Sequence, residues 1–126
     1  MSMKKIMIVD DEPDQIFTTG RVLKDAGADY EIIPAESGEK CLELLKNNEI
    51  PDLILLDIMM PGMSGWRVFD ELKDNPSWRN IPVVFLTACV DNFAKDAGTF
   101  LAEDYIKKPY DIDDLKKRVD KILKKQ

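Results

Sequence analysis

The sequence contains no histidine among its 126 residues. This absence excludes Ser-His-Asp and Cys-His catalysis, histidine-ligated zinc, and any phosphohistidine carried by the chain itself. The two cysteines, Cys41 and Cys89, are too few for a disulfide scaffold, and Cys41 falls in a helical apolar pattern that indicates a small buried residue. No apolar run is long enough to span a bilayer, and residues 1–5 lead into a strand-like run and not into a signal peptide. We therefore expect a cytoplasmic protein with no membrane partner.

Positively charged residues are fewer than negatively charged ones. The 18 Lys and Arg residues are outnumbered by 24 Asp and Glu residues, which gives a net charge of −6 and argues against a nucleic-acid partner. Basic residues cluster at 116–118 and 124–125, in a helical pattern whose last turn favours cations, so we interpret them as a solvated face. The length suits one domain, and we expect residues 1–126 to form it without a linker, a repeat or an output domain.

Short apolar runs alternate regularly with longer amphipathic segments. The runs 5–9, 53–56 and 83–86 are continuously apolar, as is typical of strands buried on both faces. Shorter runs at 30–33 and 105–107 predict two more strands, and Pro34 indicates that the first of these ends there or lies at a sheet edge. Five strand–helix pairs predict an α/β fold: a parallel sheet with helices on both faces, joined by right-handed crossovers.

The amphipathic segments carry helix start and stop signals. Pro13 suits a first helical turn, Ser37, Ser64 and Asp111 are N-cap residues, and Asn75-Pro76 ends the third helix. Gly98-Thr99 interrupts the segment 91–101, which predicts a short or bent fourth helix. The residues expected to face inward are Ile16, Gly20 and Leu23; Cys41, Leu44 and Leu45; Val68, Phe69 and Leu72; and Ile112, Leu115, Val119, Ile122 and Leu123.

Polar residues follow the apolar runs: Asp10, Asp11, Asp57, Thr87 and Lys108. Because the carboxyl ends of parallel strands share one edge of the sheet, we expect all five to meet there. The repulsion among three adjacent carboxylates costs on the order of several kcal/mol. A hard divalent cation such as Mg²⁺ would relieve this repulsion, so the group favours a metal site. A carboxylate, a lysine and a hydroxyl beside such an ion suit phosphoryl transfer. A lone Asp at a strand end is more often a helix cap or turn former, and the combination of five favours a site.

The chain resembles the receiver domain of bacterial and archaeal response regulators over nearly all of its length. The matching segments are Ile8-Val9-Asp10-Asp11-Glu12, residues 55–65 (LLDIMMPGMSG), Val84-Phe85-Leu86-Thr87-Ala88 and residues 104–110 (DYIKKPY). The resemblance implies a flavodoxin-like, doubly wound sheet of order 2-1-3-4-5 with five helices. It also implies a two-component phosphorelay protein without enzymatic turnover of its own.

The resemblance further implies a role for each site residue. Asp57 would be the phosphoacceptor. Magnesium, with Mn²⁺ as a substitute, would be bound by Asp11, Asp57, the main-chain oxygen of Met59 and, through a water molecule, Asp10.

Three further positions match the switch of the family. Thr87 would be the hydroxyl that closes on the phosphoryl group, and Tyr105 the aromatic residue that turns inward with it. Lys108 holds the lysine position because it precedes Pro109, and their peptide bond would be cis. Phosphorylation would then change the surface of helix 4, strand 5 and helix 5.

The segment 91–104 departs from the family. Leu101-Ala102 precede Glu103-Asp104 where relatives have Gly-Ala, so the output surface cannot be copied from them. Met59 and Cys89 flank the site without strongly polar groups, and we predict no strong aid to self-dephosphorylation from them.

The leading function is a signalling module that takes a phosphoryl group from a histidine kinase, a histidine phosphotransfer protein or a small phosphodonor. It would act on a downstream protein target, as a monomer or weak dimer. An aspartyl-phosphate phosphatase usually has a second acid two residues after the nucleophile, where Met59 stands. A flavin carrier is disfavoured because the acidic loop 10–14 would repel a phosphate. A receiver that binds partners without being phosphorylated is a further alternative.

Overall fold

A computed structural model gives the structure of the chain and describes residues 3–25, 30–87 and 102–124. Five parallel strands form one sheet of order β2-β1-β3-β4-β5, as predicted. The described part contains four helices, and the fourth helix expected over 91–101 lies outside it. In chain order the elements are β1 (Lys4–Val9), α1 (Pro13–Asp25), β2 (Tyr30–Ala35), α2 (Gly38–Lys46), β3 (Leu53–Leu56), α3 (Gly65–Asp74), β4 (Val83–Thr87), β5 (Asp104–Lys107) and α5 (Ile112–Lys124).

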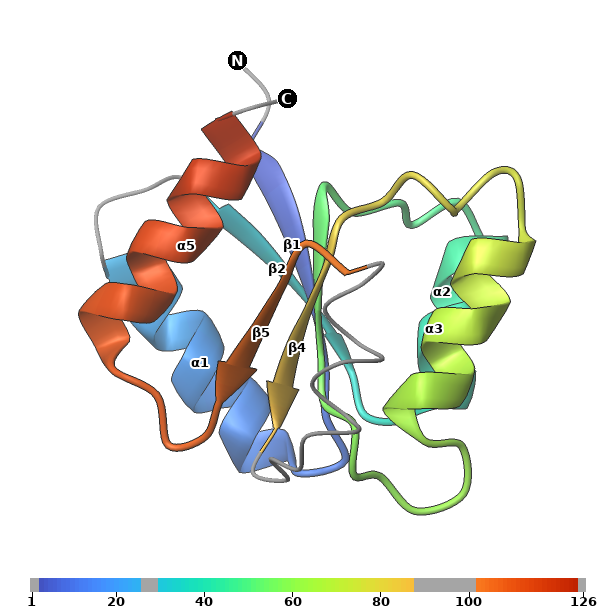
Figure 1. Cartoon of the computed structure of the whole chain (residues 1–126), viewed down its shortest axis with the longest axis horizontal. Coiled ribbons are helices and arrows are strands. Elements are labelled where there is room, and N and C mark those ends of the chain that lie inside the picture. The colour runs from blue at the N-terminus through green and yellow to red at the C-terminus, as the bar shows by residue number, and fades with distance from the viewer. Residues whose placement is uncertain (1–2, 26–29, 88–101, 125–126) are drawn as a thin grey trace.

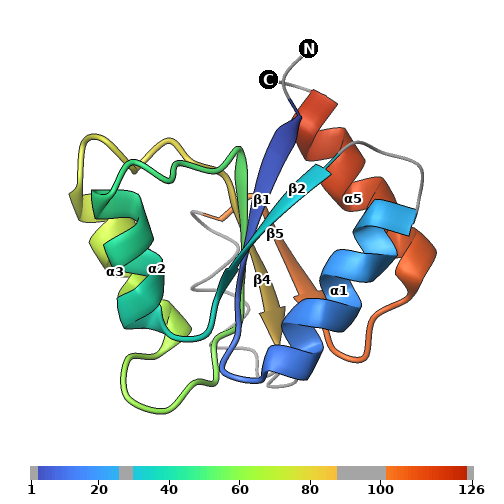
Figure 2. The ribbon, with the colours of Figure 1, turned by 180° about the vertical axis from the view of Figure 1, so that it is seen from behind.

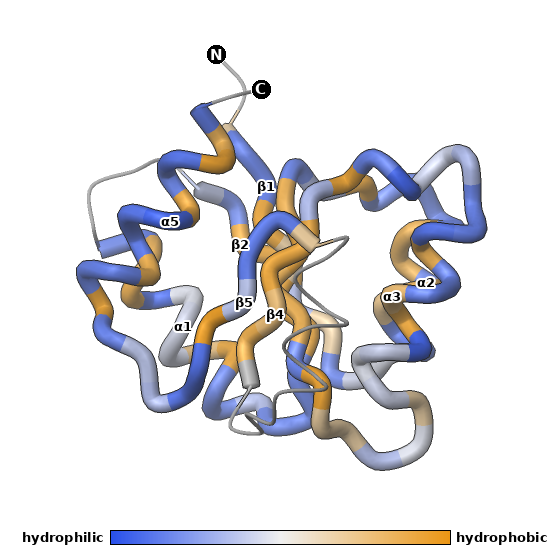
Figure 3. The backbone as a smooth tube through the Cα atoms, in the orientation of Figure 1, coloured by the Kyte–Doolittle hydropathy of each residue, from blue (hydrophilic) through white to orange (hydrophobic). Residues whose placement is uncertain are grey.

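Helices cover both faces of the sheet. Figure 1 and the reverse view in Figure 2 show α1 and α5 on one face and α2 and α3 on the other. Successive side chains of a strand point to opposite faces, so β3 serves two cores. Leu53 and Leu55 pack in the α1/α5 core, whereas Ile54 and Leu56 pack in the α2/α3 core. The central strands are therefore apolar on both sides, and Figure 3 shows their consecutive hydrophobic residues in orange.

The predicted N-cap residues are confirmed. Ser37 accepts a hydrogen bond from the Lys40 amide (3.0 Å), and Ser64 accepts one from the Arg67 amide (3.3 Å). Asp111 does the same for the Asp114 amide at the start of α5 (3.0 Å). Each cap satisfies an amide that has no partner within the first helical turn, so each helix begins where its cap stands.

Two details concern the periphery of the sheet. β2 is an edge strand and contains Pro34, which is tolerated there because an edge strand leaves one row of amides unpaired.

The prediction that Ile112 faces inward is wrong, because its side chain is 54% exposed. Ile112 is the first residue of α5 and lies over a surface groove, whereas Leu115 and Val119, further along, are fully buried.

Among the described residues, no helix has both the length and the apolar character needed to cross a membrane.

Candidate functional site

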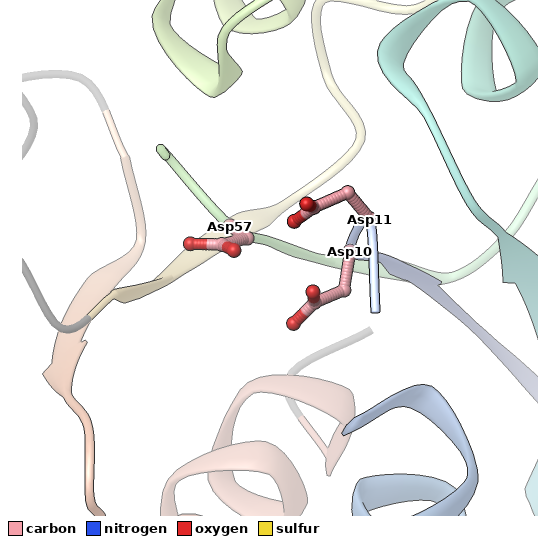
Figure 4. A group of neighbouring side chains, drawn as sticks. All are labelled: Asp10, Asp11 and Asp57. Carbon is pink, nitrogen blue, oxygen red and sulfur yellow. The ribbon is translucent and has the colours of Figure 1, made fainter. Parts of the chain in front are cut away.

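Three carboxylates meet where β1 and β3 end. Asp10 and Asp11 follow β1, and Asp57 follows β3, which is paired with β1 in the sheet. One carboxylate oxygen from each of the three lies within 4.8 Å of the others. Figure 4 shows the three side chains extending the same way from the two strand ends. Adjacent parallel strands thus bring together residues 46 or 47 positions apart, as the strand pattern predicts.

Backbone hydrogen bonds fix these carboxylates. The Asp57 amide donates to the Val9 carbonyl (2.9 Å), which extends the β1–β3 pairing to the site. The Asp57 Oδ1 accepts from the Met59 amide (3.3 Å), and the Asp10 Oδ1 accepts from the Glu12 amide (3.0 Å). Asp10 and Asp57 are only 4% and 8% exposed, so their positions are set by the fold and not by solvent.

Gly65 allows α3 to start close behind Asp57. Its amide donates to the Ile58 carbonyl (2.9 Å). A Cβ atom at this position would stand 2.2 Å from the Asp57 carbonyl oxygen and 2.7 Å from the Ile58 Cα, where no real Cβ fits. The close approach therefore requires glycine.

Lys108 brings the positive charge to the three carboxylates. It follows the end of β5, and its side chain is 17% exposed. The Lys108 Nζ lies 2.7 Å from the Asp10 Oδ2 and 3.9 Å from the Asp57 Oδ2. Lys108 is therefore bonded to Asp10 and stands within ion-pair distance of Asp57.

The acidic group and Lys108 line one open groove of about 560 Å³. The groove continues along α1 past Thr18 and Val22 and along the segment that leads into α5, past Tyr110 and Ile112. Met59, 62% exposed, lies beside Asp57 in the same groove. The groove is large enough for a phosphoryl group and is lined by both polar and apolar side chains.

Burial raises the pKa of Asp57 from 3.8 to about 6. Lys108 opposes this shift by favouring the ionised form, whereas Asp10 adds to it by repulsion. The hydrogen bond from the Met59 amide lowers the pKa, and repulsion from Asp11, the smallest of these causes, raises it. Asp57 is thus a carboxylate whose negative charge is incompletely compensated by the protein.

The three carboxylates fit a hard divalent cation. Each offers an oxygen atom, and the oxygens are close enough together to share one ion. Lys108 brings one positive charge to the three carboxylates, so a divalent cation would supply the further positive charge that they need.

The other predicted site residues are placed less completely. Thr87 is the last residue of β4 and pairs with Lys107 of β5. The side chain of Thr87 and the whole of Cys89 lie outside the described part of the structure. The Lys108-Pro109 peptide is cis, as predicted. Tyr105 is half-buried, and its ring centroid lies 6.3 Å from that of Phe85.

One contact beside the site was not predicted from the sequence. The hydroxyl groups of Thr19 in α1 and Tyr110, which precedes α5, are 2.5 Å apart. Thr19 shares the inward face of α1 with Ile16 and Leu23. A polar residue on an apolar face needs a buried partner, and this was the signal available in the sequence.

Comparison with known proteins shows the family to which the chain belongs. The response regulator receiver domain family matches residues 6–120. A Vibrio cholerae protein named "Probable cyclic di-GMP phosphodiesterase" is 43% identical over 94% of the chain, which covers 26% of that protein. The alkaline phosphatase synthesis transcriptional regulatory protein PhoP of Bacillus subtilis is 36% identical over 97% of the chain and 49% of its own length. The chain therefore spans a quarter to a half of these relatives.

A solved structure shows the same fold. The N-terminal domain of a response regulator receiver protein from Methanoculleus marisnigri is 38% identical, with a TM-score of 0.76 over 97% of this chain and 98% of that one. The family match includes both strand ends that carry the carboxylates and the segment that carries Lys108. This chain belongs to the response regulator receiver domain family, and it is a signalling domain of two-component systems.

Proposed function

We propose that Asp57 accepts a phosphoryl group from a phosphohistidine of a histidine kinase or a histidine phosphotransfer protein. The observation that supports this most is the convergence of three carboxylates and Lys108 in one groove at the carboxyl ends of the strands. We assign Asp57 as the acceptor because it lies within ion-pair distance of Lys108 and accepts a hydrogen bond from the Met59 amide. A pKa of about 6 leaves its carboxylate mostly ionised, and hence nucleophilic, at pH 7.5.

In the proposed step, an Asp57 oxygen attacks the phosphorus atom in line with the imidazole nitrogen. A new O–P bond forms, the P–N bond breaks, and its electron pair remains on the imidazole nitrogen of the donor. The Lys108 ammonium, 2.7 Å from Asp10 and 3.9 Å from Asp57, would contact a phosphoryl oxygen bound at Asp57. The Met59 amide would donate a second hydrogen bond.

Magnesium fits the oxygen donors of Asp11 and Asp57, with the main-chain oxygen of Met59 and, through water, Asp10 completing the proposed set, and Mn²⁺ as a substitute. When bound, such an ion supplies positive charge to the phosphoryl oxygens. The protein's own part is to hold the carboxylates together against their repulsion, which the backbone hydrogen bonds at Asp10 and Asp57 do.

A switch in the β4–β5 region is the proposed output. Thr87 would move toward the phosphoryl group and Tyr105 would turn inward. The pairing of β4 with β5 supports this coupling, because Phe85 lies opposite Tyr105 and Thr87 lies opposite Lys107. The recipient would be a downstream protein in the cytoplasm, reached by a surface that includes β5 and α5.

Intact mass spectrometry after incubation with acetyl phosphate and MgCl₂ tests the acceptor. We expect the wild type to gain about 80 Da, the mass of one phosphoryl unit. Asp57→Asn should gain nothing, because an amide oxygen is not a competent nucleophile here.

The matched control is Asp70→Asn, which alters an exposed carboxylate on α3 and should be phosphorylated like the wild type. A wild type that stays unmodified by both acetyl phosphate and a phosphohistidine donor would overturn the proposal and favour a receiver that only binds partners. Modification of Asp57→Asn would place the acceptor elsewhere.

A further inference from the structure

The Thr19–Tyr110 hydrogen bond connects two parts of the chain that are 91 residues apart. Thr19 is only 2% exposed, so its hydroxyl depends on this partner and not on water. The Tyr110 ring packs against the α1/α5 core at the same time. The contact is thus a partly buried polar bond at the edge of an apolar core.

The Lys108–Asp10 ion pair joins the same two regions of the chain, the one leading into α1 and the one leading into α5. α1 begins three residues after Asp10, and Tyr110 stands two residues after Lys108. Residues 108–111 belong to neither β5 nor α5. Lys108 has a flexible four-carbon side chain, so the place of its ammonium depends on how firmly its backbone is held. Tyr110 anchors this short segment to α1.

We propose that Tyr110 is a positioning residue: its hydroxyl, held by Thr19, sets the place of the Lys108 ammonium beside Asp10 and Asp57. Through Lys108 it sets the rate at which Asp57 accepts a phosphoryl group, and this part rests on the proposed function. The geometry supports the assignment because Tyr110 lines the same groove as Lys108 and both carboxylates. A displacement of a catalytic group by about 1 Å is enough to slow a reaction severely.

The variants Tyr110→Phe, Thr19→Val and the double variant test the proposal. Tyr110→Phe keeps the ring in the core and removes only the hydroxyl. At saturating Mg²⁺ and acetyl phosphate we expect phosphorylation to slow about tenfold in each variant. The single variants leave a buried hydroxyl unpaired and should lower Tm, whereas the double variant removes both partners and should recover most of it. A double variant that regains the rate along with Tm would show a merely structural role and overturn the proposal.

Tyr30→Phe is the matched control. The Tyr30 hydroxyl donates to Asp120 of α5, twelve residues after Lys108, so this variant also loses a partly buried tyrosine hydrogen bond. We expect a lower Tm and an unchanged rate. If Tyr30→Phe slows phosphorylation as much as Tyr110→Phe does, the effect follows stability and the proposal fails.

A second readout follows Lys108 directly. In a Lys108→Ala background, Tyr110→Phe should slow phosphorylation no further, since the group it positions is absent; an additional slowing would overturn the proposal. In metal-free protein, the ¹⁵N relaxation of the Lys108 ammonium should show greater mobility in Tyr110→Phe than in the wild type. This measurement needs no phosphodonor. A wild type that is not phosphorylated would defeat the proposed function, whereas unchanged Lys108 mobility would defeat the positioning role.

Discussion

The ionised form of Asp57, which the proposed function needs, lowers the free energy of unfolding. Burial and the neighbouring carboxylates raise its pKa to about 6, which means that the folded chain holds a proton there more tightly than the unfolded chain does. The contribution of Asp57 to the free energy of unfolding is therefore greatest below pH 4. It falls as the pH rises from about 4 to about 6, where the folded protein must accept the charge.

Replacing Asp57 by Asn should accordingly stabilise the metal-free protein at neutral pH. The shift from 3.8 to about 6 corresponds to a gain on the order of 2 to 3 kcal/mol at pH 7.5, and to little gain at pH 4. Urea unfolding of both proteins in chelator at the two pH values measures this difference. A lower free energy of unfolding for Asp57→Asn at pH 7.5 would mean that the ionised carboxylate is stabilised by its surroundings, contrary to the burial described here.

At the scale of elements, the site depends on how closely α3 approaches the end of β3. Gly65→Ala should lower the free energy of unfolding by about 2 to 3 kcal/mol and slow phosphorylation, because the new methyl group collides with the backbone of Asp57 and Ile58. Chemical denaturation and the acetyl phosphate assay measure the two effects. Gly20→Ala is the control: its Cβ would meet only the Ile32 side chain, at 3.3 Å, so it should be milder in stability and neutral in rate. Equal effects at both positions would contradict the role assigned to Gly65.

The elements themselves could be predicted from the sequence because their signals are local. An apolar run ending at Asp57 and a serine cap at Ser64 need no tertiary information to be recognised. The orientation of Ile112 could not be read in this way, because the helical period does not say how far a helix reaches beyond the sheet. The Thr19–Tyr110 bond and the tight approach of Gly65 also depend on how whole elements pack, and a periodicity carries no such distance.

For the whole molecule, parallel topology makes the acidic site a consequence of the fold. Because β1 and β3 are neighbours in the sheet, Asp10 and Asp11 must lie beside Asp57, and strand order together with the resemblance was sufficient to predict this. The unfolded chain has no reason to hold these carboxylates together. A cation that binds all three therefore binds the folded state alone and stabilises it.

Magnesium should consequently raise the Tm of the wild type by several degrees relative to chelator. At a concentration a hundred times its dissociation constant, a ligand specific for the folded state adds about 2.7 kcal/mol. The shift should shrink in Asp11→Asn, which removes a ligand oxygen, and remain in Asp70→Asn, which removes an equal charge from a distant surface. Calorimetry in MgCl₂ and in NaCl of matched ionic strength separates binding from general screening, since screening acts on both variants alike. If the two salts raise Tm equally, the three carboxylates are tolerated through Lys108 and solvent, and the divalent site does not exist.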